Sequence, residues 1–264
     1  STRTAGQTKL KDAYRQVKDR IAAAATRANR KAGDIVMVAV TKNASPDEIR
    51  TVVELGQQDL GENRVQQLQQ RVASLREFMS RRRTLSGAAT AGHEQPLPQV
   101  RWHMIGHLQR NKVKPVLPLV RLIHSVDSLR LAEEIQQLAS RMDRVVEVLI
   151  QVNASGEESK FGVAPPAVAH LAEQMQTMLH VKLRGLMTMA PYSEQAEDSR
   201  GTFGRCAELF NDMLASGAGG KEFNILSMGM SGDYEVAIEE GANLIRIGRA
   251  LFGEAPPGSD QADD

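Results

Sequence analysis

The sequence predicts an α/β protein built as a closed (β/α)₈ TIM barrel, with one extra helix ahead of the first strand. Apolar strand-like segments alternate with helix-like segments along the chain, which is typical of a parallel sheet with crossover helices. Eight strand candidates stand in this series, and the chain has 264 residues, close to the roughly 250 of a typical barrel. An open doubly wound sheet is the alternative arrangement of the same segments.

The expected strands are short apolar segments separated by polar ones. The first, 36–41, is a continuous apolar run that Lys42 follows directly. Such a run indicates a strand that is buried on both faces. The later strands are expected at 59–60, 101–105, 122–125, 145–152, 183–188, 224–227 and 244–247.

The helix after the first strand has the clearest start signal in the chain. Ser45 suits the N-cap, Pro46 the first helical position and Glu48 the capping-box partner, so we expect a helix over 45–55. The other helices are expected at 10–32, 64–78, 111–117, 165–180 and 198–214, together with one that Asp127 caps and that runs to 140, and one that starts at Ser231 and ends before 241.

These elements predict one domain over 1–254. Two segments fall outside the alternating pattern. The stretch 81–99 runs from a basic cluster into small residues and prolines, which indicates a surface insertion. The stretch 255–264 is polar and contains proline, which indicates a disordered tail.

Composition argues against several classes of function. The apolar content of 41% and charged content of 25% suit a folded core. A net charge of +1 and an aromatic content of 4% give no basis for binding nucleic acid or an anionic membrane. Cys206 is the single cysteine, expected as a small core residue, and no histidine–carboxylate spacing indicates a metal site. Without a signal-peptide or membrane-spanning segment, we expect a cytoplasmic protein.

Lys42 is the first candidate functional residue. It lies at the carboxyl end of a buried strand, where the active sites of barrels are found. An amine held against an apolar core has a lowered pKa and can attack carbonyl groups. Taken by itself, the segment favours a surface lysine that extends from the end of a strand, and only the rest of the chain reverses this preference.

Two glycine-containing turns add a candidate phosphate site. Residues 227–232 leave the seventh strand and 246–250 leave the eighth, and barrels commonly bind phosphate with the loops after these two strands. Backbone N–H groups at Gly229 and Gly248 can approach an anion closely, and Ser231 can add a hydroxyl. The alternative is that the glycines serve a tight turn and Ser231 a helix cap. A nucleophilic lysine and a phosphate cradle together suggest pyridoxal 5'-phosphate (PLP).

Arg246 lies on the eighth strand and is expected to point inward. Because arginine does not release its proton, a guanidinium that faces a pyridine nitrogen keeps that nitrogen unprotonated. The alternative is an outward arginine in a salt bridge. His103 and His107 are more simply explained as hydrogen-bonded structural residues than as ligands of a cofactor.

Several blocks of the chain resemble the pyridoxal phosphate homeostasis proteins, which are single-domain relatives of the alanine racemase barrel. The resemblance covers about residues 35–253. The blocks are VAVTK at 38–42, GEN at 61–63, WHMIGHLQRNK at 102–112, HSVDS at 124–128, LRGLM at 183–187, LSMGMS at 226–231 and IRIGRALFG at 245–253. Arg249 departs from the family pattern, which often has a small hydroxyl residue at that position.

The resemblance implies a fold-type III PLP barrel with Lys42 as the Schiff-base residue. It implies Arg246 at the pyridine nitrogen and a phosphate held around Ser231, Gly248 and Arg249. The complete expected binding set is Lys42, Asn63, Ser125, Met187, Ser227, Gly229, Ser231, Arg246, Gly248 and Arg249.

The family is described as buffering the cofactor, so the resemblance implies storage or delivery of PLP rather than an established catalytic activity. The implied partners are PLP and PLP-dependent apo-enzymes, and we expect a monomer. The first alternative is an amino-acid racemase, but the short stretch after the eighth strand leaves no second domain to supply the base on the opposite face. The second alternative is a barrel that binds a phosphorylated ligand without a covalent bond, which leaves Lys42 unexplained.

Overall fold

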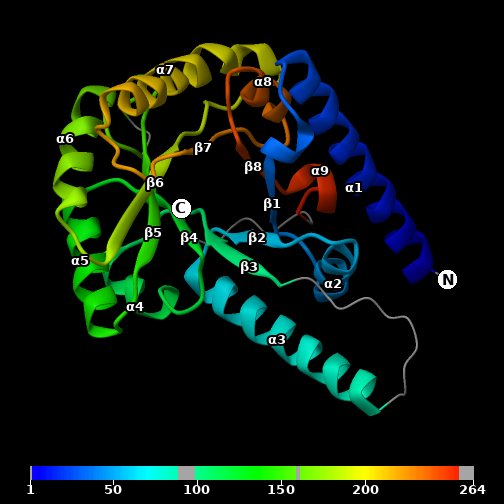
Figure 1. Ribbon diagram of the computed structural model, residues 1–264. Coiled ribbons are helices and arrows are strands. Elements are labelled where there is room, and N and C mark those ends of the chain that lie inside the picture. Colours follow the sequence, from blue (N-terminus) through cyan, green and yellow to red (C-terminus); the bar gives the residue numbers. More distant parts are fainter. Residues whose placement is uncertain (1, 89–98, 159–160, 256–264) are drawn as a thin grey trace.

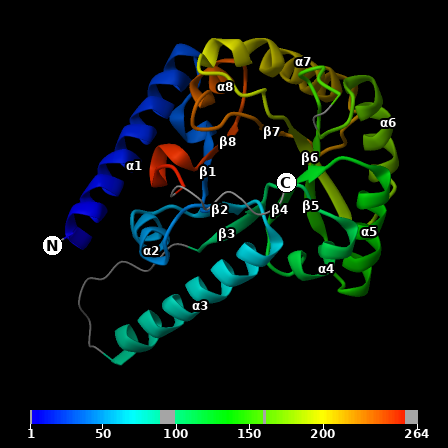
Figure 2. The same cartoon turned by 180° about the vertical axis from the view of Figure 1, so that it is seen from behind.

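The computed structural model describes residues 2–88, 99–158 and 161–255 and forms a closed barrel of eight parallel strands (Figure 1). The strands follow one another around the barrel in sequence order, and β1 pairs with β8. The opposite view shows the same ring of helices outside the strands (Figure 2). Pairing between the first and last strands confirms the predicted (β/α)₈ barrel and contradicts the open sheet.

The strands lie close to their predicted positions, and the helices between them cover the outside of the barrel. The strands are β1 Val36–Val40, β2 Asp59–Glu62, β3 Arg101–Met104, β4 Leu122–Val126, β5 Val146–Gln151, β6 Val181–Met187, β7 Ile225–Ser227 and β8 Leu244–Ile247. The α-helices are α1 Thr2–Arg27, α2 Pro46–Glu54, α3 Val65–Ala88, α4 Val113–Val116, α5 Leu129–Arg141, α6 Pro165–Gln176, α7 Arg200–Ser216, α8 Tyr234–Glu239 and α9 Arg249–Phe252, with short 3₁₀ turns at Ala32–Asp34, Arg110–Lys112 and Ala196–Ser199.

The start of α2 forms as its sequence predicts. The Ser45 hydroxyl accepts a hydrogen bond from the Glu48 backbone N–H at 3.2 Å, and the Glu48 carboxylate accepts one from the Ser45 N–H at 2.7 Å. This capping box satisfies two helix-end donors and fixes the direction in which the chain leaves β1. The turn that carries Lys42 therefore has a defined conformation.

Several predicted helix boundaries were wrong. The helix expected over 165–180 ends at Gln176, and the one expected over 111–117 is a 3₁₀ turn followed by the short α4. The N-terminal helix begins at Thr2 rather than at residue 10. The third helix does not end near Phe78 but continues to Ala88, because no proline or glycine interrupts its helix-forming residues before Gly87. The extra N-terminal helix ends at Arg27, where Asn29 takes a positive φ of 55°. The cap of α5 is Ser128 rather than Asp127, with its hydroxyl accepting from the Leu131 N–H.

A further correction concerns α8, which begins at Tyr234 after Asp233 and not at Ser231. Within the expected surface insertion, residues 81–88 belong to α3, and 89–98 lie outside the described residues. Residues 256–264 of the expected tail lie outside them as well.

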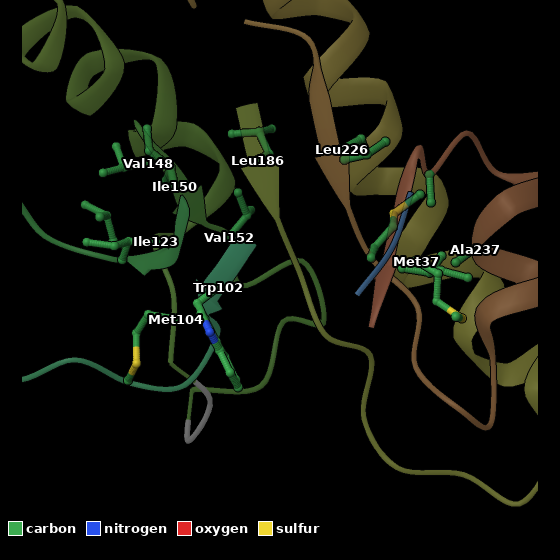
Figure 3. Packing of buried hydrophobic residues seen from close by; sticks show 14 of the residues in the cluster. Met37, Trp102, Met104, Ile123, Val148, Ile150, Val152, Leu186, Leu226 and Ala237 are labelled. Carbon is green, nitrogen blue, oxygen red and sulfur yellow. The ribbon is translucent and has the colours of Figure 1, made fainter. Parts of the chain in front are cut away.

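Apolar side chains form two packed layers, one outside the strands and one inside the barrel. The outer layer joins strands to helices and includes Trp102, Ile123 and Ala237 (Figure 3). The inner layer is a small cluster of Val38, Leu122, Leu149, Met187 and Leu244. The side chains of both layers are buried, as expected for a barrel whose interior is a core with a site at one end.

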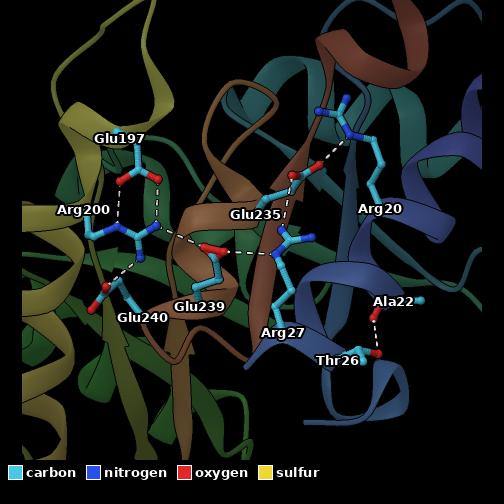
Figure 4. A network of polar contacts seen from close by, with 9 residues as sticks. All are labelled: Arg20, Ala22, Thr26, Arg27, Glu197, Arg200, Glu235, Glu239 and Glu240. Atoms are coloured by element: carbon cyan, nitrogen blue, oxygen red, sulfur yellow. Dashed lines mark hydrogen bonds and ion pairs between the residues drawn. The ribbon is translucent and has the colours of Figure 1, made fainter. Parts of the chain in front are cut away.

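Helix α1 packs across the place where the barrel closes, against α8 and α9 beside β1 and β8 (Figure 1). A network of ion pairs holds it there (Figure 4). Arg20 pairs with Glu235 at 2.5 Å, Arg27 pairs with Glu239 at 3.2 Å, and Arg200 reaches the same Glu239 from α7 at 3.1 Å. Exposed pairs of this kind stabilise weakly one at a time, but shared carboxylates couple three helices.

Among the described residues, no helix has both the length and the apolar character needed to cross a membrane.

Candidate functional site

The candidate site lies at the carboxyl ends of the strands. Lys42 is half-buried in the turn after β1. Ala39 pairs with Ile247 on β8, so Val40 lies beside Gly248 and Lys42 follows two residues later. The barrel therefore brings the predicted nucleophile next to the predicted phosphate loop, although 206 residues of sequence separate them.

Arg246 points into the barrel, as predicted, and its side chain is 3% exposed. One of its terminal nitrogens donates to the Ser227 hydroxyl at 2.5 Å and the other to the Thr188 carbonyl at 3.1 Å. Burial lowers its pKa to about 10. Among the described residues no carboxylate lies within ion-pair distance of this guanidinium, which is a costly arrangement for a buried charge.

The two loops predicted to bind phosphate are joined by a hydrogen bond. The Ser231 hydroxyl, after β7, accepts from the Ala250 backbone N–H, after β8, at 3.0 Å. Ser231 therefore bridges the loops instead of capping α8, which explains why that helix begins three residues later than predicted. Arg249 lies on the exposed side of the same junction, with its guanidinium close to Gly232.

Different neighbours leave little room for a side chain at the two glycines of these loops. A Cβ on Gly248 would lie 3.3 Å from the Cβ of Val40, because the chain after β8 passes close to the end of β1. Gly229 has a φ of +102°, and a Cβ there would lie 2.6 Å from the Cβ of Ala237. Gly229 is therefore required by the turn and by the packing of α8, which favours the tight-turn interpretation at this position.

The remaining predicted site residues differ in what surrounds them. Ser125 is fully buried, and its hydroxyl has no hydrogen-bond partner among the described residues. Asn63 is half-buried and its carbonyl lies against Gly106, where a Cβ would come within 2.1 Å of it. Met187 is fully buried in the inner apolar cluster. The orphan hydroxyl of Ser125 points to a ligand more directly than either of the other two.

An ion pair supports the turn of Lys42 from outside the barrel. The fully buried Glu62 carboxylate accepts from the Thr41 hydroxyl at 2.6 Å and from Arg71 at 3.1 Å. Burial raises the pKa of Glu62 despite these partners. Arg71 also reaches the Lys42 carbonyl at 3.5 Å and lines a cavity of about 240 Å³ between α2 and α3. That cavity lies beside the strand ends rather than within them.

The other titratable candidates are structural. Burial raises the pKa of Cys206 to about 12, as expected for a core thiol. His107 stacks on Phe161 with ring centroids 4.4 Å apart. Within residues 2–88, 99–158 and 161–255, no group of three or more His, Cys, Asp or Glu side chains is placed to hold a metal ion.

Sequence reasoning missed His124. It is fully buried inside the barrel, where its Nδ1 lies 3.0 Å from the Ser227 hydroxyl and its Nε2 lies 2.9 Å from His103. The two-residue alternation in β4, with His124 two positions after the inward Leu122, was the available signal. The contact with Ser227 runs between β4 and β7, which are not neighbours, so no local pattern reveals it.

Comparisons with known proteins agree on one family. Residues 14–256 match the family described as "Alanine racemase, N-terminal domain". A pyridoxal phosphate homeostasis protein from Aquifex aeolicus is 39% identical over 243 residues, which cover 90% of this chain and 95% of that protein. This chain belongs to the pyridoxal phosphate homeostasis protein family.

Solved structures of similar proteins show the same fold. A crystal structure of an unknown protein from Bifidobacterium adolescentis has a TM-score of 0.81 at 37% identity, covering 94% of this chain and 96% of that one. PipY from Synechococcus elongatus PCC7942, solved with PLP bound, has a TM-score of 0.72 at 30% identity, covering 90% of this chain and all of that one. A protein of the same fold, 30% identical to this chain, thus binds PLP.

Proposed function

We propose that this protein binds PLP as a Schiff base on Lys42 and serves intracellular PLP homeostasis by storing or delivering the cofactor. The observation that carries the proposal is the Arg246 guanidinium, which is buried inside the barrel with no carboxylate partner among the described residues. A buried cation without an ion-pair partner favours a ligand that accepts its hydrogen bonds. The pyridine nitrogen and phosphate of PLP provide such acceptors.

The residues present fit this cofactor. Lys42 supplies the amine for the aldehyde, and Ser125 supplies a buried hydroxyl without a partner. Ser231 and the backbone of Gly248 lie together at the junction of the last two loops, where a phosphate is expected. Arg246, held by Ser227, lies within the barrel below this junction. The larger proposed set also contains Asn63, Met187, Gly229 and Arg249.

The chemistry of Arg246 supports a non-catalytic role. PLP catalysis uses the ring as an electron sink, which requires a protonated pyridine nitrogen for full effect. A guanidinium that donates to this nitrogen leaves it unprotonated. The relatives' name, pyridoxal phosphate homeostasis protein, supports the same conclusion. We propose further that the protein acts as a single-domain monomer in the cytoplasm, with PLP-dependent apo-enzymes as recipients.

The deciding experiment locates the covalent bond. The purified protein mixed with PLP is expected to show the visible absorbance of a protonated Schiff base, and borohydride reduction is expected to fix the adduct on the peptide that contains Lys42. Lys42→Ala removes both signals while leaving the fold intact. Lys112→Ala, which replaces an exposed lysine, is the matched control. An adduct on another lysine in the unaltered protein contradicts the proposal.

A second experiment tests the racemase alternative. The PLP-loaded protein is incubated with L-alanine and other amino acids, and both chiral conversion and exchange of the α-proton with solvent deuterium are followed. Homeostasis predicts no chiral conversion at ordinary enzyme rates of about 1–10³ s⁻¹. Turnover in that range with any of these amino acids establishes an enzyme instead.

A further inference from the structure

Five polar side chains form a continuous hydrogen-bond path through the barrel interior, which we call the interior chain: Asp59, His103, His124, Ser227 and Arg246. It begins at the amino-terminal end of β2, passes through β3 and β4, crosses the barrel to β7 and ends on β8. The carboxylate at one end and the guanidinium at the other are far apart along the path, and two histidines and a hydroxyl connect them.

The end at Arg246 fixes the direction of the first bonds. Arginine has only donors, so the Ser227 oxygen accepts its hydrogen bond. Among the described residues, the only other partner of this hydroxyl is the Nδ1 of His124, at 3.0 Å. A buried hydroxyl hydrogen without an acceptor is destabilising, so the Ser227 hydroxyl donates to Nδ1. His124 must then carry its proton on Nε2.

The end at Asp59 is compatible with this assignment. Burial opposes ionisation of Asp59, but hydrogen bonds from His103 and Arg101 together hold its pKa below the ordinary value. As a carboxylate it only accepts, so the Nε2 of His103, at 2.8 Å, is the donor. The proton that the Arg246 end of the path places on the His124 Nε2 then points at the His103 Nδ1, at 2.9 Å, which accepts the hydrogen bond.

The two directions meet without conflict at the pair of histidines. Burial, with smaller electrostatic effects of His103 and Arg246, holds the pKa of His124 well below its ordinary value, so this ring is neutral and carries one N–H proton. Every donor in the interior chain therefore points the same way, from Arg246 toward Asp59. When all donors in a chain of hydrogen bonds point the same way, each bond polarises and strengthens its neighbours.

We propose that the interior chain is a positioning device in which Asp59, acting through the two histidines, fixes the Ser227 hydroxyl as an acceptor and so orients Arg246 toward the bound cofactor. A guanidinium has five N–H groups, and the two described bonds to Ser227 and Thr188 leave three for a ligand. The proposal rests on the proposed function only for the identity of that ligand. It assigns control of the cofactor ring to a carboxylate at the opposite end of the barrel.

The first test is the position of the protons, which requires no cofactor. Long-range ¹H–¹⁵N correlation spectra of the protein labelled on its six histidines report the tautomer of each ring, and His103→Gln and His124→Gln assign the two signals. The expected result is a proton on Nε2 of both rings, with and without PLP. A proton on Nδ1 of His124 overturns the proposal, whether or not the protein binds PLP.

The second test separates the effect of hydrogen-bond direction from the effect of side-chain packing at position 103. Glutamine at position 103 can donate to Asp59 through its amide nitrogen and accept from His124 through its oxygen, so His103→Gln preserves the direction of the chain. Phenylalanine fills the space of the ring but breaks the chain. We expect His103→Phe to weaken PLP affinity at least about tenfold, the equivalent of one charge-assisted hydrogen bond, and His103→Gln to weaken it by less than about threefold.

Arg101→Gln is the matched control. Arg101 donates to both oxygens of Asp59, at 3.0 and 2.8 Å, but lies outside the interior chain, so its loss disturbs the same end of the barrel without breaking the path. It is expected to leave PLP affinity unchanged. Equal affinities of the Gln and Phe variants at position 103 overturn the proposal while leaving Schiff-base formation on Lys42 intact. If His103→Phe does not fold, the tautomer of His124 in the unaltered protein decides whether the proposal stands.

Discussion

Replacing Arg246 with methionine is expected to stabilise the cofactor-free fold while weakening cofactor binding. The guanidinium is 3% exposed and forms hydrogen bonds with Ser227 and Thr188 but no ion pair among the described residues. Under the proposed function, its charge serves to bind a ligand rather than to stabilise the fold. Methionine is unbranched and flexible, so it fills much of the same space without a charge.

The magnitude follows from the lowered pKa. A fall from 12.5 to about 10 corresponds, at about 1.36 kcal/mol per pH unit, to roughly 3 kcal/mol of charge burial at neutral pH. Against this gain, Arg246→Met leaves the Thr188 carbonyl without its donor, a loss of about 1–3 kcal/mol, while the Ser227 hydroxyl loses one hydrogen bond but keeps the one to His124. The variant is thus expected to gain between zero and about 2 kcal/mol in free energy of unfolding, while PLP affinity falls at least about tenfold.

Urea unfolding of the cofactor-free proteins measures the stability, with the fluorescence of the buried Trp102 and circular dichroism as two probes of one transition. Arg184→Met is the matched control, because Arg184 is a mostly buried arginine that is paired with Glu147. Its loss is expected to destabilise the fold by about 1–3 kcal/mol. If Arg246→Met instead loses more than about 1 kcal/mol, the guanidinium supports the fold and the reasoning fails.

Three further predictions concern the fold that positions the site. Ser45→Ala removes a capping-box hydroxyl and is expected to lower the urea midpoint, with a loss of about 1 kcal/mol. Gly185→Ala places a Cβ 1.7 Å from the Ile225 carbonyl oxygen and is expected to destabilise by at least about 3 kcal/mol, with little soluble protein. Because the folded state keeps His124 neutral, stability is expected to fall below pH about 6.5, by up to about 1.4 kcal/mol per pH unit, and His124→Gln to lose that slope.

The sequence was sufficient to predict those parts of the site that depend on strand ends. Lys42 follows an apolar run, and Arg246 occupies an alternating inward position, so the barrel assignment alone places both near one mouth. Ser45 and its capping box are local, and they form as predicted. These features depend on short-range periodicity and on a single topological choice.

Features that depend on tertiary contacts were predicted less well. Ser231 suits a helix N-cap by its place in the sequence, but its hydroxyl accepts a hydrogen bond from the Ala250 backbone N–H in the next loop. The contact between His124 and Ser227 joins residues 103 positions apart across the barrel. Asp59 has no local signal that marks it as part of a site. In each case one polar group has several possible partners, and only the closed barrel selects among them.

Closure of the barrel between β1 and β8 has a consequence for the order of folding. Val36 pairs with Leu244, and Arg20 on α1 reaches Glu235 on α8, a separation of 215 residues. Contacts this distant in sequence form late, because loop closure costs entropy before they contribute any stability. Until they form, β1 and β8 are open edges to which another chain can pair. Lys42 stands on one side of this junction and Arg246 on the other. If these two residues bind PLP as proposed, the protein can bind it only when the ring is complete, and the rate at which binding appears during refolding measures the closing step.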